Sequence, residues 1–174
     1  MKRVFQCVVL LSLAFGLAAC GSEPGASPSP ASTERFTAIL LPANEVPAIT
    51  NAEAGGSATA TITFNVTKDS AGYVTAASMD VNVTASGFPN GTALTNAHIH
   101  PGAAGTNGSV FVNVGLSAGE VTFPSGGGSF SKTGIALTVD QINTILANPS
   151  SYYFNIHTAL NPNGVARGQL TRAQ

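Results

Sequence analysis

Three histidines are the residues of this chain best suited to coordination chemistry. His98 and His100 stand two residues apart in NAHIHPGAAGTNGS, and His157 stands in FNIHT. On a β-strand, residues two apart point to the same face, at about 6.5–7 Å along the backbone. Neutral imidazoles are ligands of copper and zinc, and three of them leave a further coordination position open. If the fold brings the two segments together, we expect a metal site whose ring nitrogens lie within about 4 Å of one another.

A structural role for the same side chains is the alternative. Imidazoles beside a glycine-rich loop can donate to backbone carbonyls, and Asn155, on the same face as His157, fits such a polar network. Arg167 either guides an anionic ligand or donates to loop carbonyls, and the second role is favoured because a lone arginine in a turn usually satisfies backbone groups. Glu45 is either a partner of Arg167 or a solvated loop acid. Asn155, Arg167 and Glu45 are therefore the candidate partners that surround the histidines.

The N-terminus predicts export and a lipid anchor. Lys2 and Arg3 precede an apolar run, Val4–Leu17, that is short for a membrane span and is typical of a signal peptide. The small residues before Cys20 resemble the lipobox of bacterial lipoproteins, in which the cysteine is lipidated. We expect residues 1–19 to be removed and Cys20 to anchor the protein in the bacterial cell envelope. A glycine follows the cysteine where an aspartate would favour retention, so the resemblance favours the outer over the inner membrane in a host that has both.

The amino-acid composition excludes some functions and some means of stabilising the exported chain. Without residues 1–19 it carries five basic and eight acidic side chains, too few and too dispersed for nucleic-acid binding. Cys7 is lost with the signal peptide, so no disulfide is expected and an apolar core must hold the fold. Residues 20–33 are rich in proline, serine and glycine without apolar periodicity, which predicts a tether. The folded domain is expected over residues 34–174.

Alternating apolar and polar residues predict β-strands through most of this domain. Ser57–Thr67 and Tyr73–Thr84 alternate most regularly and, with the turn between them, predict a hairpin. A strand starting near Thr92 carries His98 and His100, and strict alternation places Leu94 and Asn96 on the histidine face. The other expected strands are Arg35–Leu41, Val110–Val114, Ser129–Thr133, Tyr152–Thr158 and Val165–Thr171.

One helix is expected, and it completes the prediction of the fold class. Thr138 and Gln141 have the spacing of a capping box, and Asn148 with Pro149 ends the helical pattern. Such a helix would cover an open end of the sheets. Seven or eight short strands with glycine and proline turns predict an all-β fold, an antiparallel Greek-key β-sandwich.

Four segments together resemble the CHRD domain, a family named from chordin. They are NEVP at 44–47, AHIHPGAAGTNGS at 97–109, YYFNIHT at 152–158 and NPNGVARGQL at 161–170. The resemblance covers about residues 34–174. It implies an extracellular domain whose biochemistry is largely unsettled. Val165-Ala166 replaces a Glu-Ile pair of the family, a loss that matters only if that acid was a ligand or the partner of Arg167, and Ser109 stands where the family more often has proline.

A more distant likeness is to copper-zinc superoxide dismutase. That enzyme also has a His-x-His strand, a later histidine and an Arg-Gly near the C-terminus of a Greek-key sandwich. It uses four histidines on copper and a separate zinc site, so three histidines cannot build a complete dismutase centre. Hydrolytic catalysis has no support either, because a nucleophile-elbow sequence and paired acids at diagnostic spacing are absent from the sequence.

The sequence therefore predicts a non-enzymatic, lipid-anchored extracytoplasmic protein with a binding or structural-interaction role. Copper or zinc on His98, His100 and His157 is the cofactor hypothesis. The alternative is a copper-handling or redox protein with a superoxide-dismutase-like sandwich. The membrane is the expected partner, through the lipid; the sequence names no protein or polysaccharide partner, and nucleic acid is not expected.

Overall fold

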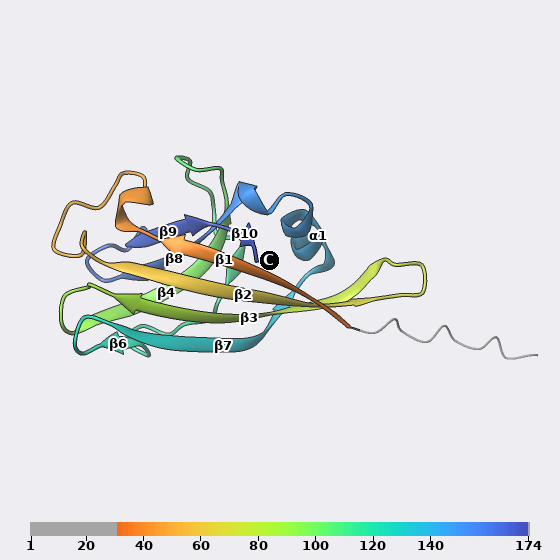
Figure 1. Cartoon of the computed structure of the whole chain (residues 1–174), viewed down its shortest axis with the longest axis horizontal. Coiled ribbons are helices and arrows are strands. Elements are labelled where there is room, and N and C mark those ends of the chain that lie inside the picture. The colour runs from red at the N-terminus through yellow and green to blue at the C-terminus, as the bar shows by residue number, and fades with distance from the viewer. Residues whose placement is uncertain (1–30, 174) are drawn as a thin grey trace, which may run out of the picture.

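The computed structural model describes residues 31–173, which fold into two antiparallel sheets with one short α-helix (Figure 1). The fold class expected from the sequence, an all-β antiparallel sandwich, is confirmed. The predicted signal peptide, Cys20 and most of the predicted tether lie outside the described residues. Within those residues, none of the helices is long and apolar enough to cross a membrane.

The first sheet consists of regular strands in the order β10-β1-β2-β3-β7. Its strands are β1 (Ser32–Leu40), β2 (Ser57–Lys68), β3 (Val74–Ser86), β7 (Gly128–Leu137) and β10 (Thr171–Arg172). In β2 the apolar side chains are buried and the threonines between them are more exposed, as period-two alternation requires. Phe64 of β2 pairs with Met79 of β3, so the predicted hairpin is confirmed.

The second sheet is shorter and less regular. It has the order β5-β4-β8-β9, with β6 also pairing with β4. Its strands are β4 (Thr92–Pro101), β5 (Val112–Asn113), β6 (Thr122–Phe123), β8 (Tyr152–Thr158) and β9 (Ala166–Gln169). β4 and β8, which carry all three histidines, are hydrogen-bonded neighbours, and Asn96 pairs with His157. The pairing on which the metal hypothesis depends is therefore present.

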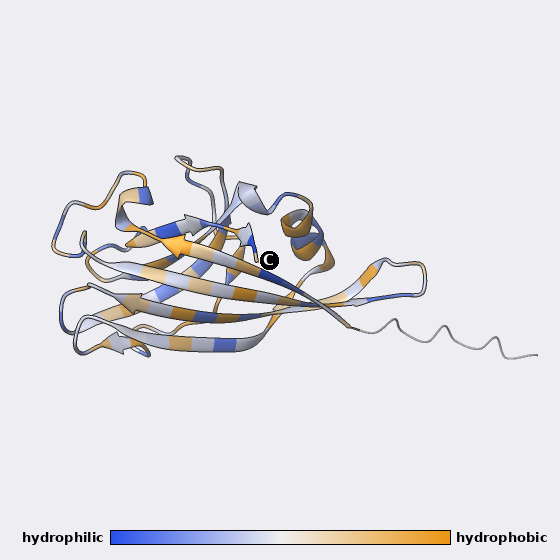
Figure 2. Ribbon diagram, in the orientation of Figure 1, coloured by the Kyte–Doolittle hydropathy of each residue, from blue (hydrophilic) through white to orange (hydrophobic). Residues whose placement is uncertain are grey.

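The core lies between the two sheets. Both sheets contribute fully buried aromatic and branched side chains, including Phe36 and Phe64 from the first and Phe154 and Ile156 from the second. The bands of alternating hydropathy along β1, β2 and β3 follow this arrangement (Figure 2). The chain changes sheets several times, from β3 to β4, from β6 to β7, from β7 to β8 and from β9 to β10.

The helix α1 (Val139–Ala147) begins with the predicted capping box. The Gln141 amide N–H donates to Thr138 Oγ1 at 3.1 Å, and the Thr138 N–H donates to Gln141 Oε1 at 2.9 Å. Ile142 and Ile145 are fully buried, so the apolar face of the helix joins the core. Two short 3₁₀-helices turn the chain: η1 (Pro42–Asn44) follows β1, and η2 (Pro149–Ser151) precedes β8.

Several strand boundaries differ from the predictions. The described residues form ten strands, two more than the eight segments that were predicted. One of the two is β6, which had no sequence signal. The other arises because the closing segment divides at Leu170 into β9 and β10, which lie on different sheets. The strand expected over Val110–Val114 is only the two residues of β5, whereas β7 extends well beyond Ser129–Thr133. β1 begins at Ser32, inside the expected tether, because its first residues pair with β2. Two-residue strands have no periodicity from which they can be predicted.

A β-bulge corrects the predicted faces of β4. Leu94 pairs with Thr158 and Asn96 with His157, so β4 has one extra residue, Thr95, at this point. Leu94 is fully buried in the core with Ala97, and the prediction that it shares the histidine face is wrong. The extra residue reverses the alternation between Leu94 and the histidines.

Candidate metal centre

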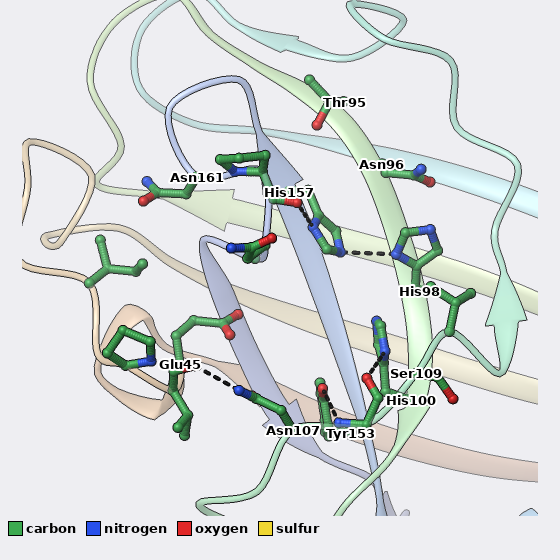
Figure 3. Close-up of a pocket in the computed structure, with 18 of the residues that line it drawn as sticks. Glu45, Thr95, Asn96, His98, His100, Asn107, Ser109, Tyr153, His157 and Asn161 are labelled. Carbon is green, nitrogen blue, oxygen red and sulfur yellow. Dashed lines mark hydrogen bonds between the residues drawn. The ribbon is translucent and has the colours of Figure 1, made fainter.

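The three histidines lie together on the outer face of the second sheet (Figure 3). One ring nitrogen from each comes within 4.8 Å of the others, slightly wider than the expected 4 Å. The shortest separation, 2.9 Å, joins His98 Nδ1 to His157 Nε2. Each histidine is only 6% exposed. This buried cluster could hold a metal ion.

Hydrogen bonds to backbone carbonyls determine the tautomers of two rings. His100 Nδ1 lies 3.0 Å from the Gly108 carbonyl oxygen, and His157 Nδ1 lies 2.9 Å from that of Pro162. A carbonyl oxygen only accepts, so each Nδ1 carries a proton and donates it. Burial lowers the pKa of both imidazoles, which keeps them neutral near pH 7. The Nε2 atom of each ring therefore carries a lone pair instead of a proton.

Both lone pairs face the side-chain oxygen of Asn155, which is another acceptor, and that of His157 also faces His98 Nδ1. Asn155 Oδ1 lies 3.1 Å from His100 Nε2 and 3.0 Å from His157 Nε2. His98 donates its Nδ1 proton to His157 Nε2, and burial together with the neighbouring histidines lowers the pKa of His98 to about 4. Three electron-pair donors thus converge on one region, an arrangement that a cation satisfies.

The cluster opens onto a cleft with a volume of about 910 Å³. Loops before β2, before β5 and after β8 form its walls, and the bulged segment Thr95-Asn96 lies at its edge (Figure 3). An ion held by the histidines would therefore have one side facing solvent or a ligand.

Tyr153, which was not among the predicted site residues, packs against the cluster. Its ring stacks parallel to that of His100, with centroids 5.0 Å apart and an interplanar angle of 5°. The Arg167 guanidinium lies 4.6 Å from the centre of the same ring. Alternation along β8 places Tyr153, Asn155 and His157 on one face, so the period of two was a signal that could have found it.

Arg167 lies behind the cluster and joins two loops. Its Nε donates to the Asn44 carbonyl at 2.6 Å, and its Nη1 donates to the Thr106 carbonyl at 3.1 Å and to Asn107 Oδ1 at 2.8 Å. Arg167 is 2% exposed and does not line the histidine cleft. These contacts are those of a guanidinium that satisfies loop carbonyls.

Glu45 is a buried acid, not a solvated one. Its Oε2 lies 3.8 Å from Arg167 Nε, and the side chain lines the cleft. Burial raises the pKa of Glu45 to about 7, although the charge of Arg167 acts in the opposite direction. The acid partner of Arg167 thus comes from the NEVP segment and not from the positions that Val165 and Ala166 occupy.

A second buried acid, Glu53, holds the loop that carries Glu45, and it was not among the predicted site residues. Its carboxylate accepts hydrogen bonds from Thr158 Oγ1 and from Asn161 Nδ2. It is 5% exposed. Glu53 therefore ties the long loop before β2 to the end of β8 and to the turn whose Pro162 carbonyl orients His157.

Fold and site together define an all-β sandwich domain with a buried three-histidine cluster under an open cleft. The sequence profile of the CHRD domain matches residues 36–170, and the chain belongs to the CHRD family. The match includes every residue of the cluster. Comparison with curated proteins and with solved structures found no match, and so adds no support for the likeness to superoxide dismutase.

Proposed function

We propose that this CHRD domain binds one divalent transition-metal ion, copper or zinc, through His98, His100 and His157. The observation that carries the proposal is the pair of Nδ1–H donors to the carbonyls of Gly108 and Pro162. Metal-ligating histidines are oriented in this way, with one nitrogen held by a carbonyl and the other free for the ion. His98 would contribute Nδ1 once its proton moves to Nε2.

The donor set favours copper or zinc over the hard cations. Calcium and magnesium take six or more oxygen ligands, whereas this cluster offers three imidazole nitrogens and one amide oxygen, that of Asn155. The depressed pKa values help, because imidazoles that are neutral at pH 7 bind a metal without first losing a proton. The competing structural role requires the Asn155 amide to be turned so that its NH₂ donates to both Nε2 atoms.

Metal titration separates these two roles. The purified protein, stripped with a chelator, is titrated with Cu(II) and with Zn(II) by calorimetry. We expect one ion per chain in the wild type and loss of that site in His98→Gln and His157→Gln. Glutamine can still donate a hydrogen bond to the groups that these two histidines contact, His157 Nε2 and the Pro162 carbonyl, so circular dichroism should show folded variants. A wild type without a stoichiometric site, or a glutamine variant that binds as tightly, would overturn the proposal.

We further propose that a lipid on Cys20 holds the domain at the bacterial cell envelope. In support, an apolar run and then small residues precede Cys20, as in a lipobox. β1 begins at Ser32, and its nine residues carry the chain about 30 Å before η1 and Glu45. The cleft wall that contains Glu45 thus lies at the end of β1 opposite to Ser32 (Figure 1). Cys20→Ser should move the protein from the membrane to the soluble fraction; an unchanged membrane fraction contradicts the anchor.

A further inference from the structure

Exposed apolar side chains gather around the mouth of the histidine cleft. Val46, Val110 and Leu160 are 38%, 52% and 56% exposed, and all three line the cleft. They are three of the six large apolar residues that are exposed between residues 31 and 173. They come from three separate loops, whereas the histidines form the polar floor. The cleft is therefore amphipathic, with an apolar mouth above a polar base.

The size of the cleft fits a small molecule better than a macromolecule. Ligand sites of proteins have volumes of about 300–1,000 Å³, a range that includes the 910 Å³ found here. A stable protein interface needs about 800 Å² from each partner, spread over 20–30 residues. Three apolar side chains around a hollow do not supply such a surface, but they can enclose the body of one organic molecule.

The charge of the site with a metal ion bound determines which polar group of a small molecule it attracts. Three neutral imidazoles leave the positive charge of a divalent ion uncompensated. Among the described residues, Glu45 is the one carboxylic acid that lines the cleft, and Arg167 lies 3.8 Å from it on the far side. An anionic oxygen donor would therefore be attracted to the open side of the metal.

We propose that the cleft binds a small organic molecule with an apolar body and an anionic oxygen head, such as a phenolate, that coordinates the metal. The body contacts Val46, Val110 and Leu160 while the head reaches the ion on the histidines. This inference rests on the proposed metal site and adds to it a class of ligand.

The catechol 4-nitrocatechol is a suitable probe, because its visible absorbance changes when it coordinates a metal. It is titrated into the purified protein after loading with one metal ion. We expect binding to the loaded wild type and none to the chelator-treated protein. Leu160→Ser and Val110→Ser should each weaken probe binding about tenfold, because both remove apolar contact area. Ile39→Ser is the matched control: Ile39 is 57% exposed, like Leu160, but does not line the cleft.

The outcomes separate this inference from the metal proposal. Metal affinity is measured first, and it should be the same in wild type, Leu160→Ser and Ile39→Ser. If the wild type takes up no metal, both proposals are overturned. If metal binds but Leu160→Ser and Val110→Ser bind the probe as tightly as Ile39→Ser, only the ligand inference is overturned. If the probe removes the metal, so that gel filtration yields metal-free protein, again only the ligand inference is overturned.

Discussion

The two sheets bury their residues in different ways. In β2 of the first sheet, buried residues alternate with more exposed ones, and the outer face meets solvent. In β8 of the second sheet, every residue from Tyr153 to Thr158 is buried. Phe154 and Ile156 lie in the core, while Asn155 and His157 are covered by loops on the outside. One sheet buries apolar area to hold the fold, and the other also buries polar groups to build a site.

Polar burial on the second sheet depends on close contact with the covering loops. Gly164 shows how close this contact is: a Cβ there would lie 2.7 Å from Glu45 Oε1 and 2.9 Å from Asn155 Nδ2. Its φ of 129° also favours glycine. Among residues 31–173, the outward side chains of β2 in the first sheet are half-buried or exposed, so these surface positions tolerate change. Substitutions on the two sheets should therefore affect different properties.

Removal of a large core side chain from the first sheet should have the largest effect on stability. Phe64 is fully buried and packs edge-on against Phe36, with ring centroids 5.5 Å apart. Phe64→Ala should lower the free energy of unfolding by about 3–5 kcal/mol, measured by urea denaturation. Because Phe64 does not line the cleft, the folded variant should still bind one metal ion. A loss below about 1 kcal/mol would contradict the role assigned to this sheet.

Removal of a polar side chain from the second sheet should affect metal binding instead. Asn155→Ala deletes the amide that lies beside two of the ligand nitrogens, and such changes usually weaken metal binding about 10–100-fold. The control is Asn82→Ala on the first sheet, which loses an exposed hydrogen bond to Ser131 and should leave affinity unchanged. Calorimetry measures both. Equal affinities would show that the Asn155 amide does not contribute to the site.

The smallest expected effect is the pH dependence of stability in the metal-free protein. Burial lowers the pKa of His98 from 6.5 to about 4, so between these two pH values the unfolded chain binds more protons than the folded protein. The histidine contribution to stability is thus present above pH 6.5 and is lost as the pH falls to 4. Burial raises the pKa of Glu45 from 4.5 to about 7, so its contribution is present below pH 4.5 and is lost as the pH rises to 7. The pKa values of His100 and His157 are lowered in the same direction as that of His98, so Glu45 should make the wild-type profile shallower than the histidines alone would.

A glutamine at position 45 should separate these contributions. Glu45→Gln removes the acid, so the stability of this variant should rise more steeply than that of the wild type between pH 4 and 7. Urea midpoints at several pH values, with a chelator present, measure both slopes. Parallel profiles would mean that the folded protein does not hold Glu45 in its neutral form.

Regular features of the chain were predictable because they depend on local physics. Alternation in Ser57–Thr67 predicted β2, and the Thr138–Gln141 spacing predicted the start of α1. The position of Leu94 was not predictable, because a single extra residue in β4 reverses its face and leaves the sequence pattern unchanged. The two-residue β6 likewise exists only because β4 is there to pair with it.

The sequence by itself determined which groups are available: three histidines, two of them on one face of a strand, within an all-β chain of the CHRD family. Only the tertiary structure decided that β4 and β8 are neighbours, that the carbonyls of Gly108 and Pro162 orient two imidazoles, and that Glu45 is buried. The physical reason is distance along the chain. His98 and His157 are 59 residues apart, and contacts over such separations depend on how the strands pair and how the loops cover them, not on local sequence preference.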